Sequence, residues 1–180
     1  MGYREMELAG RYGLSAAAFR AALDAAGLKA PAGHVGIPEL TDGIDQTIAD
    51  AKTLGHRYLI LPWVGEEYRS VDGWKRGADL LNRAGERCRA AGITVGYHNH
   101  DFEFLQIPDA SEGREGHREC GYDVLLRHTE PKLVMFELDL FWIRKGGRDA
   151  LAYFREHRGR FRSVHVKDMA ADGAMVDVGQ

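Results

Sequence analysis

Strand-like and helix-like segments alternate along most of this 180-residue chain, and this alternation limits the folds that it can adopt. Short runs rich in apolar residues are followed by stretches whose apolar residues recur at helical spacing. Such alternation is typical of right-handed βαβ units around a parallel sheet. Six strands are predicted at residues 5–9, 28–35, 57–63, 93–100, 133–142 and 161–167. Helices are predicted at residues 15–26, 41–54, 74–88, 122–128 and 149–157.

A parallel α/β sheet of this kind is either open and doubly wound or closed as a (β/α)8 barrel. No glycine-rich phosphate loop follows any predicted strand, which disfavours the nucleotide-binding open sheet. Active sites of barrels lie at the carboxyl ends of the strands. Polar residues gather late in the predicted strands: His34, His98, His100, Asp139, His165 and Lys167. We therefore expect one α/β domain of the TIM (β/α)8-barrel type over residues 1–180.

The composition disfavours several classes of partner. The chain has 24 Lys and Arg against 27 Asp and Glu, a net charge of -3, which argues against nucleic acid as the main partner. Cys88 and Cys120 are too few for a disulfide framework, and neither lies in a metal motif. No apolar run approaches the length of a membrane span, and the polar start at Met1 is not a secretory signal. We expect no membrane partner and a cytoplasmic location.

The segment Tyr97–Phe104 carries an unusual density of reactive side chains. It holds two imidazoles, an amide and two carboxylates directly after an apolar run. Divalent metals and sugar hydroxyls both require this mixture of nitrogen and oxygen groups. A capped strand end with solvated histidines is the alternative, but two histidines at i and i+2 near a glutamate favour a site. The polar stretch at residues 109–120 is predicted to be a loop and a candidate lid.

Strand alternation places some of these side chains inside the barrel. In residues 133–142 the even positions are apolar and should face the helices, so Glu137 and Asp139 should face inward. In residues 161–167, Val164 and Val166 should face the helices, and Ser163, His165 and Lys167 should face inward. His98 and His100 share one face of the preceding strand. Three neighbouring strands therefore direct His, Asp and His toward one axis.

A carboxylate on that axis needs compensation, because a buried unpaired charge costs several kcal/mol. A metal shared by Asp139 and His165 would supply the opposite charge. The alternative is an ion pair of Lys167 with Asp139 or with Glu137, without a metal.

Five segments together resemble the sugar phosphate isomerase/epimerase superfamily, the xylose isomerase-like TIM barrels that share the fold of AP endonuclease family 2. The resemblance covers nearly the whole chain. It is carried by Gly2–Gly10, Ala49–Gly55, Tyr97–Phe104, Glu137–Trp142 and Val164–Asp168.

The resemblance implies one divalent cation, typically Mn²⁺, Mg²⁺, Co²⁺ or Zn²⁺, held by Glu, Asp, His and Glu from four late strands. Asp139 and His165 match the Asp and the His. His98 stands where many members have the first Glu. His98, His100 and Glu103 are therefore all candidates for the third ligand. We expect Glu103 to fill it. The Glu of the eighth strand has no counterpart here.

Members of this superfamily are usually longer than this chain. The resemblance implies that the segment contains strands two to seven and is truncated at both ends. Such a piece would expose two parallel sheet edges. We expect it to be poorly stable alone, with a smaller natural barrel as the alternative.

The resemblance implies an isomerase or epimerase that acts on a sugar or sugar-derived ketone through an enediolate. His98 and His100 are candidate bases, and Lys167 would bind a substrate oxygen. His34, Trp63 and Trp142 are candidate substrate contacts, although core packing would also explain the tryptophans.

Two alternatives to the isomerase stay open. One is a metal-dependent lyase or dehydratase acting on a keto-inositol or 3-keto-sugar. Another is an inactive truncated barrel. An abasic-site nuclease is disfavoured, because it needs more metal ligands and a basic surface. The expected partner is a small-molecule carbohydrate, and a homo-oligomer remains open.

Overall fold

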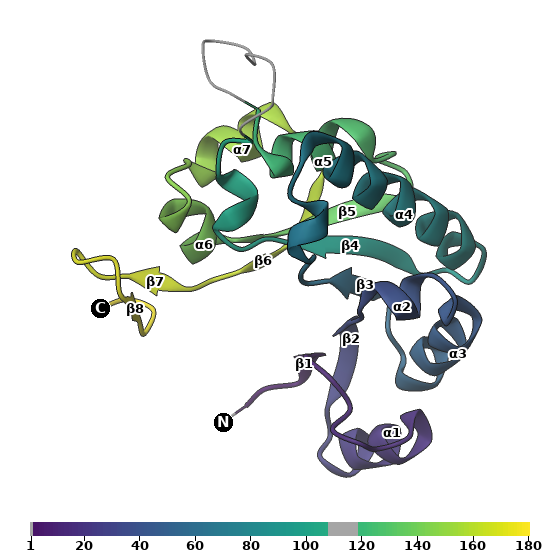
Figure 1. Ribbon diagram of the computed structural model, residues 1–180. Helices are drawn as coiled ribbons and strands as arrows, with labels where there is room; N and C mark the ends of the chain where they lie inside the picture. The colour runs from purple at the N-terminus through teal and green to yellow at the C-terminus, as the bar shows by residue number, and fades with distance from the viewer. Residues whose placement is uncertain (1, 108–118) are drawn as a thin grey trace.

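The computed structural model describes residues 2–107 and 119–180, which form a curled parallel sheet with helices against its convex face (Figure 1). The sheet has six strands in sequence order, and each neighbouring pair is parallel. The strands are β1 (Glu5–Leu8), β2 (Lys29–His34), β3 (Tyr58–Leu61), β4 (Thr94–His98), β5 (Val134–Asp139) and β6 (Phe161–His165). The fold is therefore a partial α/β TIM barrel, which confirms the predicted fold class.

Helices connect successive strands, and local capping residues set several of their ends. They are α1 (Ala16–Ala25), α2 (Ile37–Leu40), α3 (Ile44–Leu54), α4 (Val71–Ala90), α5 (Gly121–His128), α6 (Leu140–Lys145) and α7 (Ala150–Glu156). The side chains of Ser15, Ser70 and Asp149 accept backbone N–H groups at the starts of α1, α4 and α7. Gly55, with a φ of 80°, ends α3. Among the described helices, none is both long and apolar enough to cross a bilayer.

The main core lies between the sheet and the helices. The even-numbered residues of β5 pack there with Trp74 and Leu81 of α4, and Phe136 is fully buried. Met135 faces the opposite way and packs with Ala32 and Ile60 on the concave face. The predicted alternation of β5 is therefore confirmed.

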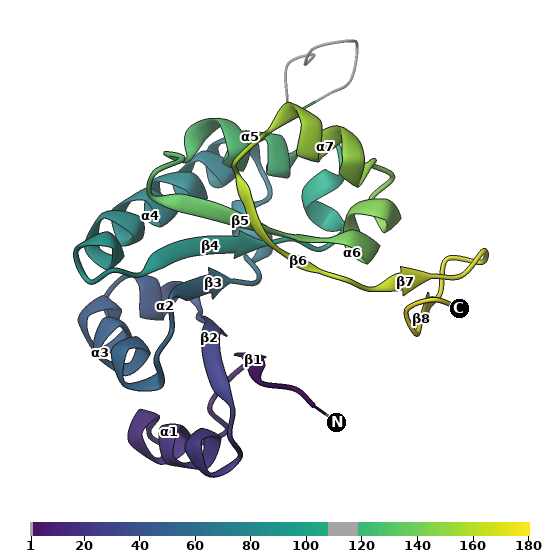
Figure 2. The same ribbon diagram turned by 180° about the vertical axis from the view of Figure 1, so that it is seen from behind.

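The outer face of β6 differs from the prediction. Val164 and Val166 were expected to face helices, but they are 42% and 58% exposed. β6 lies at one edge of the six-stranded sheet. In the view from behind, the chain runs on from β6 toward the small hairpin of β7 (Asp168–Met169) and β8 (Met175–Val176) (Figure 2). This hairpin occupies the tail, for which the sequence predicted no regular element.

The strand predicted at residues 133–142 is too long. Asp139 ends β5 and caps α6, because its Oδ1 accepts the backbone N–H groups of Phe141 and Trp142 at 3.0 and 3.1 Å. Trp142 therefore lies on a helix and not on a strand. The loop predicted at residues 109–120 lies almost wholly outside the described residues.

Candidate metal centre

Polar side chains from neighbouring strands gather at the carboxyl edge of the concave face. Parallel pairing sets His98 opposite Glu137, and Asp139 opposite His165. The ring centroids of His98 and His165 lie 4.6 Å apart, and those of His34 and His98 lie 6.0 Å apart. The edge of the sheet therefore collects imidazoles and carboxylates from segments that are distant in sequence.

One group consists of His98, Asp139 and His165, whose ligand atoms lie within 4.8 Å of one another. Asp139 Oδ2 lies 3.9 Å from His98 Nε2 and 3.7 Å from His165 Nδ1. Asp139 is fully buried, and His98 is nearly so. The structure thus brings together Asp139, His165 and His98, which strand parity directed toward one axis, and of the three candidates for the third ligand it places His98 in the group.

A second group shares His165 and adds Glu7, His34 and Glu137, again within 4.8 Å. Glu7 Oε1 lies 2.5 Å from His34 Nε2, and His165 Nε2 lies 3.4 Å from the same oxygen. Glu7 was not predicted as a site residue. The apolar residues on either side of it, Met6 and Leu8, were the signal that could have assigned it to the inner face.

The donor atoms of these two groups fit a divalent cation. Imidazole nitrogens and carboxylate oxygens are ligands of Zn²⁺, Mn²⁺ and Co²⁺. Within the described residues, five converging buried atoms lack a hydrogen bond of good geometry: Glu7 Oε1, His34 Nε2, His98 Nδ1, Glu137 Oε1 and Asp139 Oδ2. Glu7 Oε1 and His34 Nε2 nevertheless lie in close contact with each other, and Asp139 Oδ2 lies in close contact with Lys167. Unsatisfied buried atoms are costly, and a cation among them would remove that cost.

The neighbouring histidines and Lys167 favour the ionised form of two carboxylates in the cluster. Burial alone would raise the pKa of Glu7, but hydrogen bonds with His165 and His34 outweigh it and hold that pKa well below its usual range. Burial likewise opposes ionisation of Asp139, yet His165 and Lys167 lower its pKa. Hydrogen bonds with Asp139 and Glu7 raise the pKa of His165 to about 10. A bound cation would compete with these protons for the same atoms.

Lys167 lies with its Nζ 2.6 Å from Asp139 Oδ2. This ion pair is the arrangement that the sequence offered as the alternative to a metal. The ammonium also lies 5.8 Å from the Trp142 ring centroid, so Lys167 and Trp142 share one side of the cluster.

His100 lies beside the cluster without joining either group. Its ring centroid is 5.1 Å from that of His98, and the ring stacks on Phe102 at 6.1 Å with an interplanar angle of 11°. Burial, with the nearby His98 and Lys167, lowers the pKa of His100 to about 4. A neutral imidazole therefore stands at the edge of the site.

Glu103 does not join the cluster, which differs from its expected role as third ligand. The short helix η2 (Phe102–Phe104) turns its carboxylate into the layer beneath the helices. There Oε1 accepts the Tyr97 hydroxyl at 2.8 Å, and Oε2 accepts the His100 backbone N–H at 2.8 Å. Glu103 therefore supports the turn that carries His100.

Asn99 is a second residue that the sequence did not single out. Its Oδ1 accepts the backbone N–H of Asp139 at 2.9 Å, and its Nδ2 donates to the Asp139 carbonyl at 3.4 Å. Asn99 is fully buried. These bonds tie the end of β4 to the end of β5 and fix the backbone of Asp139.

The buried carboxyl of Glu103 makes stability depend on pH. Burial raises its pKa to about 7, against the opposing hydrogen bond from Tyr97. Because the folded-state pKa lies above the unfolded value of 4.5, its contribution to stability is complete below about pH 4.5 and is lost as the pH rises through 7. Glu103→Gln should flatten the decline of unfolding free energy across this window in urea titrations.

The matched control for this prediction is Glu67→Gln, which changes an exposed carboxyl on η1 (Glu66–Tyr68). It should retain the pH slope of the parent protein. If the unfolding free energy of Glu103→Gln fell with pH as steeply as that of the parent, Glu103 would not be the source of this pH dependence.

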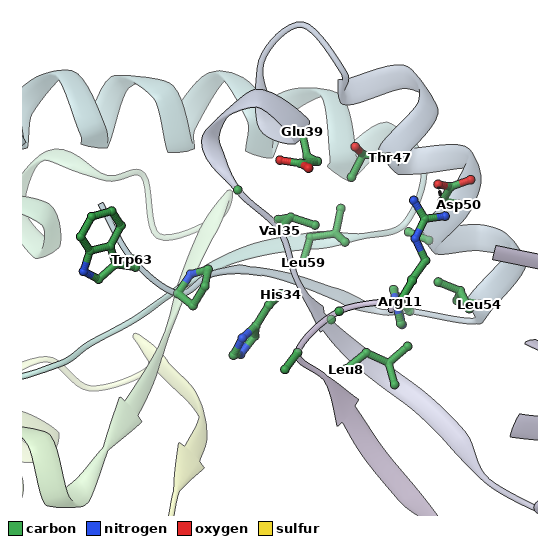
Figure 3. Close-up of a pocket in the computed structure, with 17 residues that line it drawn as sticks. Leu8, Arg11, His34, Val35, Glu39, Thr47, Asp50, Leu54, Leu59 and Trp63 are labelled. Carbon is green, nitrogen blue, oxygen red and sulfur yellow. Dashed lines mark ion pairs between the residues drawn. The ribbon is translucent and has the colours of Figure 1, made fainter. Parts of the chain in front are cut away.

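A cavity of about 480 Å³ adjoins the cluster between the ends of β1 to β3 and α3. His34 and Trp63 line it, and Trp63 is 52% exposed. Trp63 and the Arg11–Asp50 ion pair lie at opposite ends of this cavity (Figure 3). The structure thus brings two of the three predicted substrate contacts to one cavity. The third, Trp142, packs beside His100 with ring centroids 5.2 Å apart.

No protein-family model matches the sequence. A crystal structure of a sugar phosphate isomerase/epimerase from Parabacteroides distasonis is similar, with 30% identity and a TM-score of 0.81 over 94% of this chain and 70% of that one. The IOLI protein, solved with a bound zinc atom, has the same fold with 15% identity and a TM-score of 0.66, over 93% of this chain and 64% of that one.

Curated relatives give a second comparison. Inosose dehydratase from Clostridium beijerinckii is 28% identical over 108 residues, which are 60% of this chain and 33% of that protein. The match with these relatives spans about a third of their length.

The fold and the cluster at the strand ends define a xylose isomerase-like TIM barrel. The chain belongs to the sugar phosphate isomerase/epimerase family, whose relatives are sugar-modifying enzymes.

Proposed function

We propose that the protein is a divalent-metal-dependent enzyme that removes a proton next to the carbonyl of a sugar or sugar-derived ketone and returns it as an isomerase or epimerase. The observation that carries this proposal is the convergence of His98, Asp139 and His165 beside the uncharged imidazole of His100. Residues 1–180 would act as one barrel-type domain, and the substrate would be a small carbohydrate.

His98, Asp139 and His165 would hold the cation, because their ligand atoms lie within 4.8 Å of one another. The IOLI protein, which has the same fold, was solved with a bound zinc atom. A divalent cation supplies Lewis-acid chemistry, which stabilises negative charge on the oxygens of an enediolate. Asn99 holds the Asp139 backbone in place, so this ligand arrives preorganised.

His100 is the proposed base. Burial, with the nearby His98 and Lys167, lowers the pKa of its ring to about 4, so the imidazole is uncharged and able to accept a proton from a bound ketone. Lys167 would weaken its ion pair with Asp139 and donate an N–H of its ammonium group to a substrate oxygen. The stacked Phe102 and the neighbouring Trp142 limit the access of water to the ring.

Dehydration is a second candidate outcome of the same proton removal. The curated relatives that match the chain are inosose dehydratases, which favours a keto-inositol as substrate and loss of water as the next step. The two candidates share the enediolate and differ in whether a hydroxyl leaves.

Exchange of the proton next to the carbonyl tests the proposal. In D2O with Mn²⁺, a keto-inositol and D-fructose serve as probes. His100→Ala should slow exchange by roughly 100-fold or more, the usual contribution of a positioned base. His128→Ala, which changes an exposed histidine on α5, is the matched control and should exchange at the parent rate.

The product separates the two candidates. An epimerase yields an isomer that carries deuterium, whereas a dehydratase yields an unsaturated ketone that has lost one water. Full-rate exchange by His100→Ala would remove His100 as the base. Failure of the metal-loaded parent protein to exchange either ketone would count against the function itself.

A further inference from the structure

Each histidine of the His98–Asp139–His165 group presents one ring nitrogen to Asp139 and the other to Glu137. On the Asp139 side, Oδ2 lies 3.9 Å from His98 Nε2 and 3.7 Å from His165 Nδ1. On the other side, Glu137 Oε1 lies 3.3 Å from His98 Nδ1 and 3.2 Å from His165 Nε2. Both rings therefore lie between the same two carboxylates, and His165 Nε2 also faces Glu7 Oε1 at 3.4 Å.

We infer that Glu137 is a positioning residue that accepts an N–H from both ligand histidines and so aims their lone pairs at a cation beside Asp139. A neutral imidazole has one lone pair and one N–H. If the nitrogens near Asp139 hold the cation, then the nitrogens near Glu137 must carry the hydrogens. The inference rests on the metal site of the proposed function and deepens it by assigning both tautomers.

The surroundings of Glu137 fit this role. The residue is 1% exposed, and its Oε1 makes no hydrogen bond within the described residues. Its other oxygen, Oε2, accepts the Ser163 hydroxyl at 2.7 Å. The ammonium of Lys167 lies on Asp139, 2.6 Å from its Oδ2. The two imidazole N–H groups are therefore suited to compensate a buried carboxylate that would otherwise be costly.

Sheet register produces this arrangement. His98 of β4 pairs with Glu137 of β5, and Glu137 pairs with Ser163 of β6. Three adjacent inward side chains thus lie in one row across the sheet. A carboxylate that accepts from a ligand histidine fixes the ring orientation and makes the ligating nitrogen more basic. Here a single carboxylate would do so for two rings.

A competing arrangement uses the second group, in which Glu137 itself binds a cation with Glu7, His34 and His165. The two arrangements need opposite tautomers of His165. In the competing one Nε2 binds the cation and Nδ1 carries the hydrogen toward Asp139. The protonated nitrogen of His165 therefore distinguishes a positioning role from a ligand role.

The test combines metal affinity with histidine tautomers, using Zn²⁺ as the probe. Glu137→Gln should bind Zn²⁺ roughly 10- to 100-fold more weakly than the parent in a chelator competition, with the stoichiometry unchanged. Ser163→Ala, which removes only the contact to Oε2, should cause a smaller loss. ¹⁵N-histidine spectra of the Zn²⁺-loaded parent should show His165 bound through Nδ1 and His98 bound through Nε2.

Three outcomes would overturn the inference. One is unchanged Zn²⁺ affinity in Glu137→Gln, the second is His165 bound through Nε2, and the third is a loss of stoichiometry equal to that of Asp139→Asn. The spectra of the parent decide the tautomers even if Glu137→Gln fails to fold. A parent protein that binds no Zn²⁺ would instead refute the metal site of the proposed function, and the inference with it.

Discussion

Replacing Phe136 with alanine is expected to lower the free energy of unfolding by about 3 to 5 kcal/mol, the usual cost of emptying a buried aromatic site. The Phe136 side chain is fully buried on the helix-facing side of β5. Its ring centroid lies 5.2 Å from that of Tyr122, and the Arg160 guanidinium lies 5.0 Å above it. Truncation would remove this packing and leave a cavity that rigid strands cannot fill.

Urea unfolding followed by circular dichroism measures this loss. Leu151→Ala is the matched control, because Leu151 is 59% exposed on α7 and its removal should change stability by less than about 0.5 kcal/mol. Equal urea midpoints for Phe136→Ala and Leu151→Ala would show that β5 is not the centre of the core.

The order of the strands could be predicted because each strand is encoded locally. Continuous apolar runs such as Tyr58–Leu61 are typical of strands covered on both faces, and glycines such as Gly55 end the helices between them. The alternation within β5 also predicted which residues face inward, since side chains change sides at every residue. These features need no knowledge of distant contacts.

The end of β5 could not be predicted in this way. Phe141 and Trp142 continue the apolar pattern of the strand, so the sequence extended it. The backbone changes direction because the Asp139 carboxylate caps the next helix. The residue type alone does not reveal whether an aspartate is an inward ligand or an N-cap, because only the local backbone geometry distinguishes the two roles.

Which residues belong to the site depends on contacts between distant segments, and the sequence does not show these contacts. Tyr97–Phe104 was interpreted as one cluster, yet the structure divides it between the two faces of the sheet. His98 faces the metal cluster, whereas Tyr97 and Glu103 bond to each other beneath the helices. Glu7 joins the cluster only because β1 and β2 pair and bring it to His34.

Asp139→Asn is expected to weaken binding of Zn²⁺ or Mn²⁺ by about 100-fold or more, since loss of a direct ligand should exceed the 10- to 100-fold cost of losing a supporting residue. Asparagine is an N-cap as good as aspartate, so α6 should remain capped. The amide, however, supplies no negative charge for a cation or for Lys167, which lies 2.6 Å from Oδ2. The variant therefore separates the ligand role of Asp139 from its structural role.

Asp139→Ala completes the comparison, because it removes both the charge and the cap. It should lose metal binding as Asp139→Asn does, and in addition about 1 kcal/mol of stability from the uncapped helix. Chelator competition measures the first effect and urea unfolding the second. If Asp139→Asn retained the metal affinity of the parent, this carboxylate would serve only the ion pair with Lys167 and the cap of α6. The cation would then have to be held by Glu7, His34, Glu137 and His165.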